Sequence, residues 1–149
     1  MPEKKTIERA RRDAREGKAP STQAGEFVRE EMEHIRDGKH GARSAKQAIA
    51  IGLSKARRAG VPLSPPKKGT ASRRTRKQAR RDIAKSRRGS RATSAKRSRA
   101  VKQALKREPR SAASHRALSR QAHSAARRRT AASRSRAAKK AANTRRRRR

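Results

Sequence analysis

One spacing in the sequence is typical of metal chemistry. Glu31-Met-Glu-His34 is a Glu-x-x-His pair, which places a carboxylate and an imidazole on one face of a helix. Helical bundles that bind two iron or manganese ions combine two such pairs with two further glutamates. This chain has one pair, no cysteine, and no zinc-ligand spacing among His34, His40, His115 and His123. We therefore expect no metal and no cofactor.

No other arrangement of residues predicts an active site. The sequence has no nucleophile elbow, no Walker-type phosphate loop and no dinucleotide-binding fingerprint. Gly52 lies inside a helical pattern, where close packing is the simpler explanation. We expect a protein that is not an enzyme.

The chemistry that dominates the chain is positive charge. Segment 67–149 carries 33 of the 48 Lys and Arg residues and only two acids, Asp82 and Glu108, whereas residues 1–66 carry 15 basic and nine acidic residues. So dense a charge attracts polyanions, and nucleic acid is the densest polyanion in a cell. Arg outnumbers Lys by 24 to 9 in this segment, which favours bidentate phosphate contacts.

The absence of aromatic residues from this segment indicates which nucleic acid it binds. Proteins that bind single strands stack bases on aromatic side chains, and the chain's one aromatic residue is Phe27. Phosphate contact without stacking is typical of duplex binding without sequence preference. We therefore predict a histone-like, nucleoid-associated DNA-binding protein that neutralises phosphates and compacts or bridges duplex DNA.

The expected phosphate contacts come from cations spread along the whole segment. They are Lys67, Lys68, Arg73, Arg74, Arg76, Lys77, Arg80, Arg81, Arg87, Arg88, Lys96, Arg97, Arg99, Lys102, Lys106, Arg107, Arg127, Arg128, Arg129, Lys139, Lys140, Arg145, Arg146, Arg147, Arg148 and Arg149. Two alternative functions stay open. One is an RNA-binding or ribosome-associated protein, and the other is a protein-interaction adaptor that acts through the N-terminal part.

The secondary structure that we expect differs from one part of the chain to the next. Residues 1–20 are a charged segment with a short solvated helix, 21–61 a helical hairpin, 62–70 a Pro-rich hinge, and 71–149 a low-complexity basic nucleic-acid-binding tail. The first hairpin helix ends at Gly38, and a capping box of Ser44 and Gln47 begins the second. The expected hairpin packing residues are Phe27, Val28, Met32, Ile35, Ile49 and Leu53.

Charges in the hairpin are segregated. The first helix carries Glu26, Glu30, Glu31, Glu33 and Asp37, and the loop and second helix carry Lys39, Arg43, Lys46, Lys55, Arg57 and Arg58. The acidic face could dock on the basic tail of the same chain, but exposed charge runs are usually solvated, so we expect the acids to face water. The basic set is expected to add a few phosphate contacts.

The tail contains three blocks that permit helix, 72–88, 93–107 and 111–142. Like charges at helical spacing oppose them, and low hydrophobicity with high net charge is the signature of disorder. The expected fold class is therefore mostly α, with a small N-terminal helical hairpin followed by a long disordered or conditionally helical basic tail.

The expected partner is nucleic acid, with duplex DNA favoured over RNA. A hairpin this small is marginal alone, so we also expect a homo-oligomer or protein contact through it. No apolar run approaches the roughly 20 residues of a membrane span. We expect a cytoplasmic protein on the bacterial nucleoid.

Three runs of the sequence resemble a family of small basic bacterial proteins classed as a domain of unknown function. The runs are Gln23-Ala-Gly-Glu-Phe-Val-Arg-Glu-Glu-Met32, His34-Ile-Arg-Asp-Gly-Lys-His-Gly-Ala-Arg-Ser44 and Lys46-Gln-Ala-Ile-Ala-Ile-Gly-Leu-Ser-Lys-Ala-Arg-Arg-Ala-Gly60. The resemblance covers about 1–66 and implies no activity. The tail is similar in composition to the Ala/Lys/Arg-rich arms of bacterial histone-like and linker-histone-like proteins, which implies chromosome association and no particular site residues.

Overall fold

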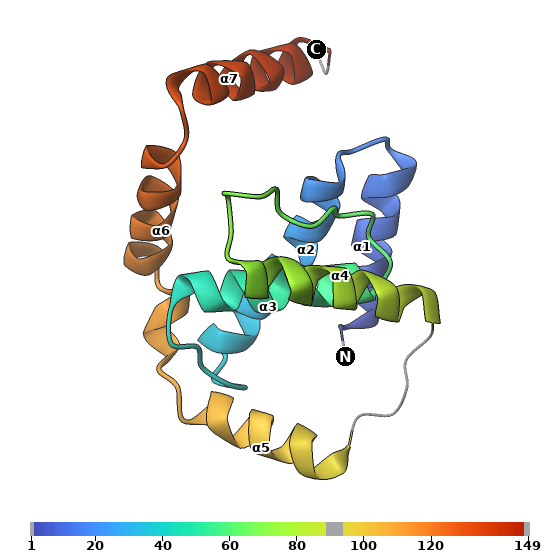
Figure 1. Cartoon of the computed structure of the whole chain (residues 1–149), viewed down its shortest axis with the longest axis vertical. Coiled ribbons are helices and arrows are strands. Elements are labelled where there is room, and N and C mark those ends of the chain that lie inside the picture. The colour runs from blue at the N-terminus through green and yellow to red at the C-terminus, as the bar shows by residue number, and fades with distance from the viewer. Residues whose placement is uncertain (1, 89–93, 148–149) are drawn as a thin grey trace. The chain divides into compact units, whose positions relative to one another are not determined.

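A computed structural model describes residues 2–88 and 94–147 of the chain (Figure 1). These residues form seven α-helices and one short 3-10 helix, they contain no strand, and 74% of them are helical. The chain divides into two units, Met1–Ser114 and His115–Arg149. None of the helices in the described ranges combines the length and the apolar character needed to cross a membrane.

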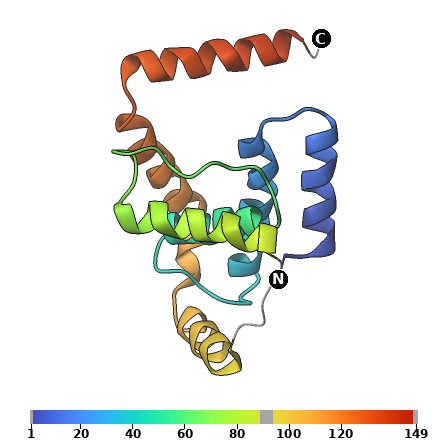
Figure 2. The same ribbon diagram turned by 45° about the vertical axis from the view of Figure 1, so that its right-hand side comes forward.

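The first unit is built around α2 (Pro20–Arg36), which packs against both α1 (Lys4–Arg15) and α3 (Ala45–Arg58). Proline at the first position of α2 suits a helix start, because its missing N–H has no partner there anyway. Figure 2 shows α1 and α2 lying side by side. Ala10 of α1 joins Ala24, Phe27 and Ala56 in a common core. The expected solvated helix is therefore a packed one.

The helix signals of the hairpin are confirmed. The Ser44 side chain accepts a hydrogen bond from the Gln47 backbone N–H at 3.2 Å, and the Gln47 side chain accepts one from the Arg43 N–H at 2.9 Å. Gly38 and Gly60 follow α2 and α3 with φ of 75° and 93°, the left-handed conformation that glycine adopts without strain. Each signal lies where the chain leaves or enters a helix.

The expected hairpin packing residues differ in how deeply they are buried. Phe27, Met32 and Ile35 are buried, while Val28, Ile49 and Leu53 are half-buried. Gly52 lets the two helices approach, because a Cβ at this position would lie 2.7 Å from the Cα of Val28.

The expectation of a long disordered or conditionally helical tail is wrong. Its described residues form α4 (Arg73–Arg88), α5 (Ala95–Lys106), a 3-10 helix η1 (Arg110–Ala113), α6 (His115–Arg127) and α7 (Ala131–Arg146). The block 111–142 is thus divided among η1, α6 and α7. The segment 89–93, where two of the predicted blocks meet, lies outside the described residues.

Two physical causes account for these helices. The first is packing, because α4 buries Ala79 and Asp82 against α3, and η1 buries Ala112 and Ala113 against α2 and α3. The second is local propensity, because α5, α6 and α7 contain no buried residue and are rich in Ala, Arg and Lys. These residues rank among the best helix formers, and a like-charge pair opposes a helix by only about 0.2–0.5 kcal/mol.

The end of α5 and the residues that follow it pack against the loop between α2 and α3. Gly41 N–H donates to the Leu105 carbonyl at 2.8 Å, and Ala42 N–H donates to the Pro109 carbonyl at 3.1 Å. The two backbones approach so closely that a Cβ on Gly41 would lie 1.8 Å from the Glu108 carbonyl oxygen. Part of the tail is therefore a structural piece of the first unit.

The tight contact at Gly52 gives a stability prediction. Gly52→Ala forces the backbones of α2 and α3 apart, so we expect a loss of about 1–3 kcal/mol in the free energy of unfolding. Gly25→Ala on α2 is the matched control, because no atom lies within 4 Å of its Cβ position. The control should gain about 0.5–1 kcal/mol from helix propensity. Urea unfolding measures both, and equal shifts would show that α2 and α3 do not pack at Gly52.

Candidate nucleic-acid interface

The cations expected to contact phosphates lie on helices. Lys67 and Lys68 precede α4, Arg107 follows α5, Arg128 and Arg129 link α6 to α7, and Arg147 follows α7. The others that the structure describes lie within helices: Arg73, Arg74, Arg76, Lys77, Arg80, Arg81, Arg87 and Arg88 on α4, Lys96, Arg97, Arg99, Lys102 and Lys106 on α5, Arg127 on α6, and Lys139, Lys140, Arg145 and Arg146 on α7. Arg148 and Arg149 lie outside the described residues.

Nearly all of these side chains face solvent. Every described member of the set is exposed except Arg76, which is half-buried. Its Nε is buried and has no hydrogen-bond partner among the described residues. Arg76 therefore belongs to the packed side of α4 rather than to its solvent-facing side.

A buried carboxylate holds α4 in place on α3. Asp82 is 2% exposed, and it accepts hydrogen bonds from the Ser54 hydroxyl at 2.6 Å and from the Gln78 amide at 3.1 Å. Its carboxylate also lies 3.7 Å from Arg58 Nε. Burial lowers the pKa of the neighbouring Arg57, and the charge of Asp82 opposes that shift. The carboxylate of Asp82 is therefore directed toward α3 and its cations.

Fixing one side of α4 leaves a cationic side turned outward. Arg74, Lys77, Arg80 and Arg81 are all exposed on this helix. At 1.5 Å per residue the 16 residues of α4 span about 24 Å, the length of about seven base pairs of duplex. We call these four residues the α4 cationic face.

None of the cations from 67 to 147 forms an ion pair with an acid of the described chain. The two acids of this segment pair instead with cations of the first 66 residues: Asp82 with Arg58, and Glu108 with Arg43 at 3.7 Å. No acid follows Glu108 in the sequence, so the second unit contains no Asp or Glu at all. Its positive charge has no internal counter-charge.

Helix α6 carries a basic surface that the sequence interpretation missed. Arg120, His123, Ser124, Arg127 and Arg128 line a shallow hollow of about 470 Å³. Their spacing of three, one, three and one residues is that of a single helix face. Of these five, only Arg127 and Arg128 were expected as phosphate contacts. For Arg120, His123 and Ser124, the i, i+3, i+4 spacing in the sequence could have indicated that they share this helix face.

The basic set of the hairpin is largely neutralised within the fold. Lys55 Nζ lies 2.6 Å from Glu31 Oε2, and Lys39 Nζ lies 3.2 Å from Glu3 Oε1. Arg57 is 8% exposed, and its Nε donates to the Leu63 carbonyl at 3.3 Å. These cations hold the first unit together and are poor candidates for phosphate contacts.

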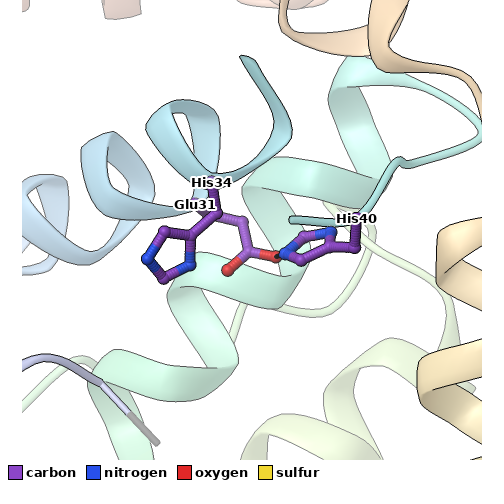
Figure 3. A group of neighbouring side chains, drawn as sticks. All are labelled: Glu31, His34 and His40. Carbon is purple, nitrogen blue, oxygen red and sulfur yellow. Dashed lines mark ion pairs between the residues drawn. The ribbon is translucent and has the colours of Figure 1, made fainter. Parts of the chain in front are cut away.

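The expectation of a solvated acidic face also needs correction. Glu30 and Glu31 are 3% and 1% exposed. Two groups of side chains bring ligand atoms within 4.8 Å of one another and could hold a metal ion. One is Glu31 with His34 and His40 (Figure 3), and the other is Glu3 with Glu30 and His34. The sequence spacing alone brought only Glu31 and His34 together.

Comparisons of the chain with protein-family models, with curated proteins and with solved structures found no match.

The role of Asp82 gives a prediction about the α4 cationic face. Asp82→Asn removes the charge opposite Arg57 and Arg58, and we expect the opening free energy of α4 to fall by about 1–3 kcal/mol. Hydrogen exchange of the α4 amides measures it. Glu108→Gln is the control, because it also removes one acid but its pair with Arg43 is partly exposed. Equal α4 protection in both variants would contradict an anchoring role for Asp82.

Proposed function

We propose that this chain is a non-enzymatic, sequence-independent DNA-binding protein of the nucleoid, which neutralises phosphates and compacts or bridges duplex DNA. The observation that carries the proposal is the set of exposed tail cations without an acidic partner in the described chain. Such a surface releases condensed counterions from a polyanion when it binds, and that release drives association without reading sequence.

Two features support duplex DNA as the ligand. The tail offers no aromatic side chain on which a single-stranded base could stack. Arginines dominate the exposed set, and their planar guanidinium groups match phosphate oxygens in pairs. Contacts of this kind position a protein on the backbone and carry no base preference.

The division of the chain into two units supports the bridging of two segments of duplex DNA. The first unit carries the α4 cationic face, and the second unit carries cations on α6 and α7 with no acid beside them. Each unit therefore has its own phosphate-binding surface. A chain with two such surfaces can contact two segments of duplex at once, and DNA whose segments are bridged in this way becomes more compact.

The proposal predicts a steep salt dependence of binding to mixed-sequence duplex DNA. The logarithm of the association constant should fall linearly with the logarithm of salt concentration, by about 0.9 for each phosphate neutralised. Replacing the DNA with a scrambled sequence should leave the affinity unchanged. Fluorescence anisotropy of the full chain between about 50 and 200 mM salt measures both. A strong preference for one sequence would overturn the proposal, and a clear preference for structured RNA at matched salt would select the RNA alternative.

A charge-matched pair of variants tests where the duplex binds. The variant Arg74→Gln, Lys77→Gln, Arg80→Gln, Arg81→Gln removes the α4 cationic face, and we expect the salt slope to become shallower by about 3.6. The control Lys4→Gln, Lys5→Gln, Arg11→Gln, Arg15→Gln removes the same charge from exposed positions of α1. It should change the slope by less than about 1. Equal changes would show that DNA responds to net charge alone and that α4 is not an interface.

A further inference from the structure

The least expected group in the first unit is a carboxylate enclosed by two imidazoles. Glu31 of α2 is 1% exposed, while the side chains of His34 and His40 are 13% and 17% exposed. Figure 3 shows His40, from the loop after α2, reaching back to the Glu31 carboxylate. The two rings stand edge to face, with centroids 6.2 Å apart. None of these residues takes part in the proposed DNA contact.

The hydrogen bonding of His40 leaves a lone pair directed at Glu31. Its Nδ1 lies 3.0 Å from the Gly41 carbonyl oxygen, which can only accept, so Nδ1 carries the proton. In the neutral ring the other nitrogen, Nε2, is then an acceptor. Nε2 lies 3.2 Å from Glu31 Oε1. Two acceptors at this distance repel each other unless a cation or a second proton lies between them.

His34 is arranged in the same way. Its Nε2 lies 2.9 Å from Glu3 Oε1, a carboxylate oxygen that accepts the ring N–H. In Figure 3 the other ring nitrogen faces the Glu31 carboxylate. One ligand atom from each of Glu31, His34 and His40 lies within 4.8 Å of the others. Each ring therefore has its outer nitrogen held by an oxygen and its inner nitrogen turned toward one carboxylate.

Glu31 itself is incompletely satisfied. Lys55 Nζ lies 2.6 Å from Oε2, yet neither Glu31 oxygen accepts a well-aligned hydrogen bond in the described chain. Lys55 balances the charge of the carboxylate through Oε2 and leaves Oε1 facing His40. A buried acceptor without a donor is unfavourable, so this site favours an additional cation.

We propose that Glu31, His34 and His40 bind one first-row transition dication of the zinc class. Zinc binds imidazole nitrogen and carboxylate oxygen at about 2.0–2.2 Å, and two such ligands of a tetrahedron lie about 3.3 Å apart, close to the separation of Oε1 and Nε2. The outer contacts also fit, since metal-bound histidines donate their second N–H to a carboxylate or a backbone carbonyl. Two nitrogen ligands disfavour Mg²⁺ and Ca²⁺, which prefer oxygen.

The second group of ligands, Glu3 with Glu30 and His34, is the weaker candidate. Glu30 Oε1 already accepts the Glu3 backbone N–H at 3.0 Å, and Glu3 is exposed. It also shares His34 with the first group, so the two cannot both be filled through the same nitrogen. In the site that we propose, Glu3 orients His34 and does not bind the metal.

Zinc titration of the full chain without nucleic acid tests the proposal. Calorimetry should show one Zn²⁺ bound per chain and no binding of Mg²⁺ at the same concentration. Ligand loss in His40→Gln should weaken Zn²⁺ binding by more than about 100-fold, and Glu3→Gln should weaken it by about 10-fold, the smaller effect of an outer partner. His123→Gln is the control, because His123 is exposed on α6 and has none of these contacts. It should bind as the unchanged chain does.

A second measurement covers the case in which a variant does not fold. In nitrogen NMR spectra of the unchanged protein, Zn²⁺ should shift the imidazole nitrogens of His34 and His40 and leave those of His115 and His123 in place. Failure to take up Zn²⁺, equal loss of binding in His40→Gln and His123→Gln, or shifts confined to His115 and His123 would each overturn the proposal. The first of these outcomes would assign the position between Nε2 and Oε1 to a proton.

Discussion

The structure depends on where a very small number of acids is placed in a very basic chain. The protein has 11 Asp and Glu residues against 48 Lys and Arg residues. Four of those acids, Asp13, Glu30, Glu31 and Asp82, are buried. A buried carboxylate is stable only with partners, and the partners here are cations of the first 58 residues and their neighbouring polar groups. Among the described residues, every ion pair therefore uses a cation of the first 58 residues, and the cations that follow residue 66 have no acidic partner.

This distribution of charge separates the two roles of the cations. Lys55 and Arg58 lie against Glu31 and Asp82, and Lys39 lies against Glu3, so these cations stabilise the fold. The cations of α4 to α7 have no acidic partner among the described residues, so their positive charge is not compensated within the fold. Composition shows the excess of charge, but only the folded chain shows which cations make up the excess. A set that looks uniform in sequence thus divides into structural and surface members.

The parts that could be predicted from the sequence rest on local signals. Phe27 and Ile35 repeat on one helix face, Ser44 and Gln47 form a cap, and Gly38 ends a helix, and each of these signals acts within a few residues. The parts that could not be predicted rest on contacts between distant residues. In the sequence, Asp82 lies in a run with the composition of the basic tail, and only the fold places it against α3. His40 lies next to Glu31 only because the loop after α2 folds back. Lys55 joins them from α3, which no spacing in the sequence indicates.

The helices of the tail are stabilised in two different ways. Helix α4 has Ala79 and Asp82 buried against α3, so its conformation is set by packing. Helices α5, α6 and α7 bury no residue, so their stability is the local propensity of Ala, Arg and Lys reduced by repulsion between neighbouring cations. These three helices are nevertheless formed in the structure, so the propensity of their Ala, Arg and Lys residues outweighs the repulsion between neighbouring cations.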